Sequence, residues 1–474
     1  MLFTSFAFLL FFPIVFILYW ALGKTVKIQN GLLVIASLVF YGFWDLKFLL
    51  LLAFTIFIGY YGGKWIANAK SNFGRKTALF FSICISLAIL GTFKYFNFFS
   101  QSLADFAAIF GWKMQPYLLK LILPVGISFY TFHNLSYVID LYYRRIEPEK
   151  SFLNYSLFVG YFPLLVAGPI ERATHLLPQL QQKREFVYSD AINGMRQILW
   201  GLFKKVVIAD TCAFYSDMVF ANPAQYPGWI VLFGLLLFTI EIYCDFSGYS
   251  DIALGISRLF GIELLRNFAF PYFSRNIAEF WRKWHISLTT WFRDYLYIPL
   301  GGSKSTKFKT IRNTIIIFLV SGFWHGANWT FIIWGALHAC YFIPLLLLGR
   351  NRKYLDFPAN NGNLPGVREA ANMLLTFLLV MFAWIFFRAE NVVSAFDFIR
   401  SLFQIKGIVP PWPFILLLSL IAFTFLVEWT GRKQAFALSR ISLPGYGRWA
   451  TYLVLGFVIY MNLGSEKEFI YFQF

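Results

Sequence analysis

The chain of 474 residues is 59% hydrophobic and only 14% charged, whereas soluble domains carry about 25% charged residues. This composition excludes an ordinary soluble fold, because the core of such a fold could not bury so much apolar surface. The net charge of +18 is assigned to Lys- and Arg-rich cytoplasmic loops and to attraction for membrane lipids. The sequence contains no zinc knuckle, RNP-like strand or basic nucleic-acid helix, so nucleic acid is not expected as a partner.

Apolar stretches recur along the chain, and a transmembrane helix needs about 20 mostly apolar residues. In chain order we predict apolar spans at 2–22, 31–44, 47–63, 77–97, 118–141, 151–168, 193–212, 228–247, 312–326, 329–348, 371–388, 413–429 and 449–463. Some of these stretches are too short to cross a bilayer alone. We therefore expect an all-α polytopic membrane protein with about 11–13 transmembrane or re-entrant helices. One membrane domain over residues 1–474 is the simplest organisation.

Glycine and proline indicate where some spans are interrupted. The stretches 151–168 and 312–326 contain one or both of these residues, so re-entrant or broken helices are predicted there. The segment 228–262 is long enough for a span followed by a shorter buried helix, with Gly248 and Gly255 breaking it.

Charge predicts the orientation of the chain. No positive segment precedes the apolar run at 1–22, so this run is expected to stay as the first helix rather than act as a signal peptide. Lys24 and Lys27 follow it, and the positive-inside rule then places the N-terminus outside. The same rule places four basic loops inside, at 64–76, 275–312, 350–368 and 432–448. Residues near 325–329 then fall in the outer half of the membrane, and the tail at 466–468 lies outside.

His325 is the strongest candidate for a catalytic residue. Ionisable side chains inside apolar stretches are costly, so each one is a candidate functional site. His325 lies between Gly322 and Gly326, which let another backbone or a substrate come close. A neutral imidazole away from bulk water can take a proton from a hydroxyl and later release it. A histidine that only bonds a neighbouring carbonyl is the alternative, and the residue type leaves both open.

Two further histidines lie in or beside apolar stretches. His285 belongs to residues 280–296, where tryptophans and basic residues alternate with apolar ones. This pattern predicts an amphipathic helix at the membrane interface, and anchoring by Trp and Arg is its simplest role. A tunnel mouth at His285 is the alternative. For His338, a structural role is expected, with a place in the same cavity as His325 left open.

Three carboxylates, Glu241, Asp245 and Asp251, fall within eleven residues of one predicted span. Glu241 and Asp245 share a helix face because they are four residues apart. A metal site would need more oxygen ligands or histidines at matched spacing, so no metal is expected. Pairing with Arg or Lys of another helix is predicted instead. The sequence also lacks the GxSxG, Walker, HExxH and GxGxxG motifs of several enzyme classes.

Five segments together resemble the membrane-bound O-acyltransferase family, and within it the bacterial branch of alginate O-acetylation and teichoic acid D-alanylation proteins. The segments are 124–132, 167–172, 245–255, 280–294 and 321–329. Trp-His-Gly and Arg-Lys-Trp-His-Ile-Ser occurring in tandem form a more specific signal than either motif alone. The resemblance spans roughly residues 120–340, and the hydropathy matches on both sides.

The resemblance implies a fold and a set of site residues. The fold would be a ring of tilted helices around a central catalytic tunnel. His325 would be the catalytic histidine, and His285 the second functional position, which lines the passage. Beyond these two residues, Asn328 or backbone N–H groups are the candidate donors to an oxyanion. The candidate substrate contacts are Trp324, Asn328, Arg282 and Asp245.

The implied activity is transfer of an acyl group, most simply acetyl, from a cytoplasmic thioester such as acetyl-CoA, with no bound cofactor. A Lys- and Arg-rich inner face would attract the donor's phosphates. The acceptor would be a hydroxyl of an exported cell-surface polysaccharide, reached directly or through an extracytoplasmic acyltransferase partner. The expected location is the inner membrane of a bacterial cell.

Three alternatives remain open. D-alanyl transfer to teichoic acid would use the same motifs. A secondary transporter or channel would explain the spans and the intramembrane charges, but transporters usually show two similar halves, and this sequence shows none. A non-catalytic scaffold for polysaccharide export would leave polymer acylation independent of His325.

Overall fold

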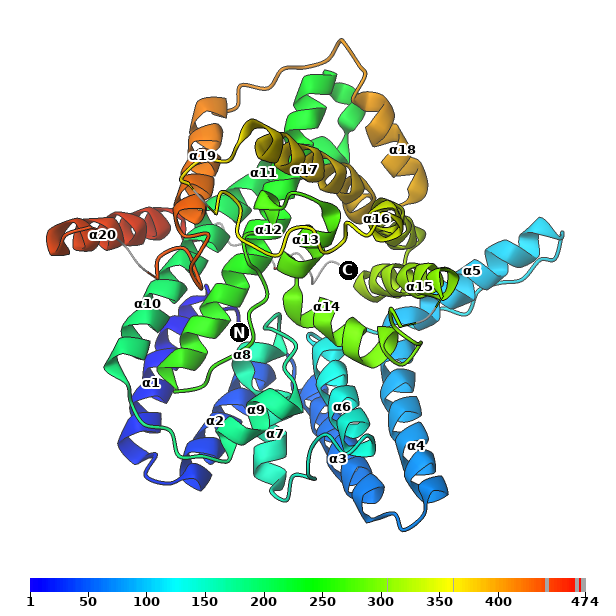
Figure 1. Cartoon of the computed structure of the whole chain (residues 1–474), viewed down its shortest axis with the longest axis vertical. Helices are drawn as coiled ribbons and strands as arrows, with labels where there is room; N and C mark the ends of the chain where they lie inside the picture. Colours follow the sequence, from blue (N-terminus) through cyan, green and yellow to red (C-terminus); the bar gives the residue numbers. More distant parts are fainter. Residues whose placement is uncertain (305, 361, 440–442, 465–468, 470–474) are drawn as a thin grey trace. The chain divides into compact units, whose positions relative to one another are not determined.

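The computed structural model describes the chain except residues 305, 361, 440–442, 465–468 and 470–474 (Figure 1). All regular structure in this described part is helical. The chain divides into two compact units, one of Met1–Gly194 with Ile256–Leu265 and the other of Met195–Gly255 with Arg266–Phe474. Two of the three boundaries fall inside the helices α10 (Tyr188–Leu202) and α12 (Gly228–Leu259), and the third lies after α12, between Leu265 and Arg266. The single membrane domain stays a prediction.

The first unit begins with a run of capped helices. Ser5, Thr25, Asp45 and Ser71 each accept a hydrogen bond from a backbone N–H in the first turn of the helix that follows. Helices α3, α4 and α6 lie side by side (Figure 1). The helices of this unit are α1 (Phe6–Leu22), α2 (Val26–Gly42), α3 (Leu46–Asn68), α4 (Asn72–Leu90), α5 (Phe96–Ile109), α6 (Ile127–Tyr142), α7 (Phe152–Gly160), α8 (Phe162–Leu165) and α9 (Ala173–Leu180).

Two predicted spans of this unit have different outcomes. The stretch 151–168 is broken into α7 and α8, as predicted. The stretch 118–141 is wrong in its first part, because α6 begins only at Ile127. Gly126, directly before it, has a φ of +75°, a left-handed conformation that interrupts a right-handed helix and suits glycine.

The second unit holds the segments with the motifs. Its helices are the remainder of α10 and α12 together with α11 (Asp210–Ala221), α13 (Ile277–Lys283), α14 (Ile286–Phe292), α15 (Lys307–His325), α16 (Trp329–Leu347), α17 (Val367–Arg388), α18 (Val392–Ser401), α19 (Phe414–Thr430) and α20 (Gly445–Asn462). The predicted break at 312–326 is wrong, since α15 runs without interruption to His325.

The predicted break in 228–262 is also wrong, because α12 is one helix of 32 residues. The reason is packing at Gly248. A Cβ there would lie 2.8 Å from the carbonyl oxygen of Gly201 and 3.0 Å from the backbone nitrogen of Lys205. Gly248 therefore allows the segment 201–205 to approach α12 closely rather than ending the helix.

Among the described residues, five helical segments are long and apolar enough to cross a membrane: Leu46–Asn68, Asn72–Ile109, Gly228–Leu259, Trp329–Leu347 and Val367–Arg388. The apolar helices α1, α2 and α19 are shorter. The chain is thus an all-helical, multi-pass membrane protein, as predicted. The predicted ring, tunnel and orientation stay predictions, and the tail at 466–468 lies outside the described residues.

Helices α15 and α16 form a close hairpin in the second unit. A Cβ on Gly322 would lie 2.2 Å from the carbonyl oxygen of Phe331, and one on Gly335 would lie 2.3 Å from that of Phe318. Real Cβ atoms do not approach an oxygen so closely, so only glycine permits this spacing of the two backbones. The hairpin places His325, at the end of α15, beside the first turns of α16.

Candidate active site

His325 is the last residue of α15, and only 2% of its surface is exposed. The helix ends there because Gly326 is extended and Asn328 caps the next helix. Three aromatic rings surround the imidazole, with centroid distances of 4.8 Å to Trp324, 5.1 Å to Trp334 and 5.2 Å to Phe387. The side chain therefore lies in an aromatic enclosure in the second unit.

His285 lies between α13 and α14 and is 1% exposed. Its φ of +42° and ψ of 55° put it in the left-handed region, which is uncommon for a residue with a Cβ. Neither ring nitrogen has a hydrogen-bond partner among the described residues. Burial lowers the pKa of His285 to about 3, so its imidazole is neutral at pH 7 and can accept a hydrogen bond. The predicted single amphipathic helix at 280–296 is wrong, because the chain breaks at this residue and turns inward.

Trp324 connects the two histidines. Its ring lies 6.0 Å from His285 and 4.8 Å from His325, measured between centroids. Two segments forty positions apart in the chain therefore meet at one indole. The structure brings together the two residues predicted to be catalytic, along with one of the predicted substrate contacts.

The segment that holds His285 in place was not anticipated from the sequence. The amide N–H of Ile286 donates to the carbonyl oxygen of Asn267 at 2.8 Å. The hydroxyl of Ser287 donates to the side-chain oxygen of Asn267 at 2.6 Å. The Asn267 amide group in turn donates to Ser250 of α12 at 3.0 Å. A lone asparagine in the loop after α12 offered little signal, because its role depends on contacts with distant segments.

His338 is joined to the same aromatic cluster, and its contacts agree with the expected structural role. Its Nδ1 accepts a 3.2 Å hydrogen bond from the indole N–H of Trp281 on α13. Its ring is parallel to that of Phe280 and lies 4.9 Å from that of Trp334.

The other predicted substrate contacts are engaged elsewhere in the protein. The Asn328 side chain accepts from the backbone N–H of Thr330 at 3.1 Å and donates to the carbonyl oxygen of Glu390 at 2.6 Å. These bonds give Asn328 a capping role and argue against its use as an oxyanion donor. Arg282 donates to the carbonyl oxygens of Asn351 and Tyr354 at 2.8 and 2.6 Å.

Asp245 belongs to a buried ion-pair cluster. Lys205 contacts Asp245 at 2.7 Å and Asp210 at 2.8 Å. Lys204 contacts Asp251 at 2.7 Å and is 3.8 Å from Glu428. The predicted pairing with basic residues is confirmed for Asp245 and Asp251. It is wrong for Glu241, which accepts a 2.5 Å hydrogen bond from the Ser216 hydroxyl.

A small pocket lies beside these charges, with a volume of about 20 Å³, enough for one water molecule. Its polar lining includes Lys204, Tyr243, Asp251, Asn267 and Glu428. No group of three or more His, Cys, Asp or Glu side chains among the described residues could hold a metal ion.

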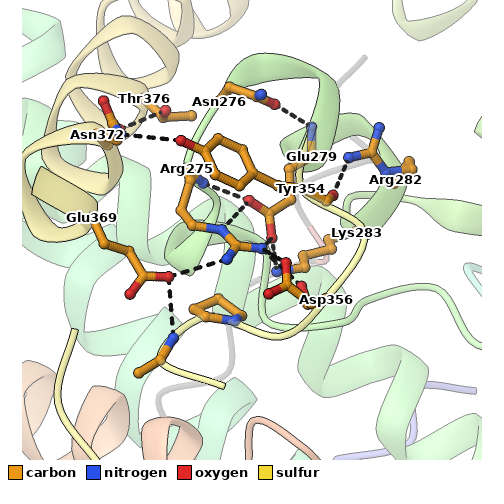
Figure 2. A network of polar contacts seen from close by, with 12 residues as sticks. Arg275, Asn276, Glu279, Arg282, Lys283, Tyr354, Asp356, Glu369, Asn372 and Thr376 are labelled. Atoms are coloured by element: carbon orange, nitrogen blue, oxygen red, sulfur yellow. Dashed lines mark hydrogen bonds and ion pairs between the residues drawn. The ribbon is translucent and has the colours of Figure 1, made fainter. Parts of the chain in front are cut away.

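A second ionic network anchors α13, the helix before His285 (Figure 2). Arg275 contacts Glu279 at 3.0 Å, Asp356 at 2.9 Å and Glu369 of α17 at 3.1 Å. Lys283 adds a 2.7 Å contact to Glu279. The network ties α13 to the loop around residue 356 and to α17, so it fixes the direction from which the chain reaches His285.

Comparison with known proteins agrees with the motifs. The sequence model of the MBOAT, membrane-bound O-acyltransferase family, matches residues 83–387. The chain is 41% identical over 410 residues to the probable alginate O-acetylase AlgI of Pseudomonas aeruginosa, covering 85% of this chain and 75% of that protein. It is 36% identical over 428 residues to the peptidoglycan O-acetyltransferase of Helicobacter pylori, covering 84% and 79%. It is 28% identical over 319 residues to the teichoic acid D-alanyltransferase of Bacillus subtilis, covering 62% and 78%.

Proposed function

Since the chain belongs to the membrane-bound O-acyltransferase family and is an O-acyltransferase, we propose that it transfers acetyl from a cytoplasmic thioester such as acetyl-CoA. The acceptor is a hydroxyl of an exported cell-surface polysaccharide, reached directly or through an extracytoplasmic partner acyltransferase. The probable alginate O-acetylase and the peptidoglycan O-acetyltransferase are more similar to the chain than the teichoic acid D-alanyltransferase is. Their names support acetyl over D-alanyl as the group transferred. The net charge of +18 suits a donor that carries phosphates.

One observation carries the mechanism, namely that the buried side chains of His325 and His285 both contact the ring of Trp324. His325 acts as the general base. It takes the proton of the acceptor hydroxyl as the oxygen attacks the thioester carbonyl carbon, and the carbonyl electron pair moves onto oxygen. When that pair returns, the C–S bond breaks, and the leaving thiolate takes the proton from the imidazolium. The ester and the free thiol are the products, so no net proton is consumed.

His285 lines the approach of the substrates to His325. Its neutral imidazole can accept a hydrogen bond from the acceptor hydroxyl or donate one to the donor thioester. In this proposal the protein lies in a bacterial inner membrane with its N-terminus outside. The donor then enters from the Lys- and Arg-rich side, and the hydroxyl acceptor enters from the opposite side.

Labelling of membranes with radioactive acetyl-CoA tests the proposal. Wild-type membranes should pass label to a polymer fraction or to a partner protein, and the labelled fraction distinguishes the direct from the relayed route. His325→Ala should lower transfer at least about 100-fold, the usual contribution of a general base, while the protein stays inserted. His285→Ala should lower transfer as well.

His175→Ala is the matched control. This histidine lies on α9 in the other unit, is partly exposed and pairs with Glu171 at 2.8 Å. Its loss should leave transfer intact. Full activity of His325→Ala would overturn the assignment of the base. Solute flux in proteoliposomes without any acyl donor would favour a transporter instead.

A further inference from the structure

Trp334 carries a buried hydrogen-bond donor that the mechanism above does not use. Its side chain is 0% exposed, and its indole N–H has no acceptor in the described part of the chain. A buried polar group without a partner destabilises the fold, and such groups are rare in native proteins. The neighbouring indole of Trp281 does have an acceptor, since it donates to His338 at 3.2 Å. The N–H of Trp334, like that of Trp384, therefore lacks an acceptor among the described residues, and Trp334 differs in lying beside His325.

The position of Trp334 relates this donor to the chemistry. Its ring is edge-on to the imidazole of His325, with a centroid distance of 5.1 Å and an angle of 84°. It stacks on Trp384 at 5.7 Å and 20°, and it contacts His338 at 4.9 Å. The glycine-mediated packing of α15 against α16 fixes both residues on adjacent backbones. A molecule that reaches His325 therefore meets Trp334.

We infer that the indole N–H of Trp334 donates a hydrogen bond to the carbonyl oxygen of the acyl group. This inference rests on the proposed function. As the acceptor hydroxyl attacks and His325 takes its proton, the carbonyl electron pair moves onto that oxygen, and the N–H stabilises the negative charge. When the pair returns, the C–S bond breaks and the thiolate takes the proton back from His325. A preorganised donor in a water-poor enclosure stabilises such a charge more than a donor in water does.

Trp334 therefore takes the role of oxyanion donor that the sequence suggested for Asn328. Both side-chain atoms of Asn328 already have partners, Thr330 and Glu390. Trp334 is rigid and fully enclosed, and it lies beside the base. It is thus the better placed of the two.

Replacing Trp334 and Trp384 by phenylalanine in parallel tests the inference, since each change removes a buried indole N–H without an acceptor in the described residues. Of these two tryptophans, Trp334 is in ring contact with His325, whereas Trp384 stacks on Trp334. We expect Trp334→Phe to lower kcat for acetyl transfer by about 10- to 100-fold, with little change in KM for acetyl-CoA, as for loss of an oxyanion donor. Trp384→Phe should stay within about threefold of wild type, because Trp384 packs on Trp334 and has no ring contact with His325 among the described residues.

A second variant separates the N–H from the shape of the ring. Benzothienylalanine at position 334 keeps the bicyclic side chain but has sulfur in place of N–H, so its kcat should fall as in Trp334→Phe. Equal losses in the two phenylalanine variants, or full activity of the benzothienyl variant, would overturn the inference. If His325→Ala abolishes transfer while both variants at 334 keep full activity, this inference alone fails. If His325→Ala stays active, the assignment of His325 as the base fails together with the inference, and the proposed function itself fails if wild-type membranes transfer no acetyl.

Discussion

Ser287 donates a 2.6 Å hydrogen bond to the side-chain oxygen of Asn267, and this bond closes the turn that holds His285 in its left-handed conformation. The backbone N–H of Ile286, directly after His285, donates to the carbonyl oxygen of the same asparagine at 2.8 Å. A conformation that is uncommon for a residue with a Cβ persists only where its surroundings determine it. Asn267 is therefore a positioning residue for His285.

Asn267→Ala should lower acetyl transfer about tenfold, or about 1.4 kcal/mol, because its side-chain hydrogen bonds to Ser287 and Ser250 are both lost from the segment that orients His285. Ser287→Ala removes the first of these bonds from the other side. The double variant should be no worse than Asn267→Ala, since residues that share one interaction are not additive. The measurement is kcat in membranes, normalised to inserted protein. Additive losses would show that the two residues act separately.

Breaking the network around α13 should unfold the second unit at a lower temperature. Arg275 and Glu279 are both buried, and removal of one partner leaves a buried charge that costs about 3–5 kcal/mol. We therefore expect Glu279→Ala to lower the temperature at which the detergent-solubilised protein loses its size-exclusion peak. Arg400→Ala is the control, because its ion pair with Asp397 is exposed and should contribute almost nothing. Equal shifts in the two variants would contradict this assignment.

Gly322→Ala should disrupt the hairpin of α15 and α16. The added Cβ would lie 2.2 Å from the carbonyl oxygen of Phe331, so the two helices must separate and shift His325. Acetyl transfer and the yield of folded protein should both fall. At Gly456 on α20, a Cβ meets nothing within 4 Å. Gly456→Ala should therefore be neutral or raise helix stability by about 0.5–1 kcal/mol. A folded, active Gly322→Ala protein would show that this close approach is not required.

Asp245→Asn distinguishes a structural carboxylate from a substrate ligand. The carboxylate is buried and pairs with Lys205 at 2.7 Å, so loss of its charge should lower thermal stability. The KM for acetyl-CoA of the protein that remains folded should not change. A raised KM at wild-type stability would instead support the substrate contact predicted for Asp245.

Much of the protein could be anticipated from local patterns. Long apolar runs predict helices that cross a membrane, and the glycines and prolines of 151–168 predict the break between α7 and α8. The tandem motifs around His285 and His325 indicate the family, which the match over residues 83–387 confirms. Each of these features depends on residues that lie close together in the chain, so it can be predicted from the sequence alone.

The tertiary structure alone decided the contacts between segments that lie far apart in the chain. Only the fold brings Trp324 against His285, pairs Asp245 with Lys205 and places Asn267 beside Ser287. Only packing explains why Gly248 leaves α12 unbroken, since a glycine can end a helix or allow another backbone to approach it. Hydropathy and spacing describe one segment at a time, and they determined the class of this protein and its candidate histidines. The partner of each buried polar group depends on which helices pack together, and that choice is made by the chain as a whole.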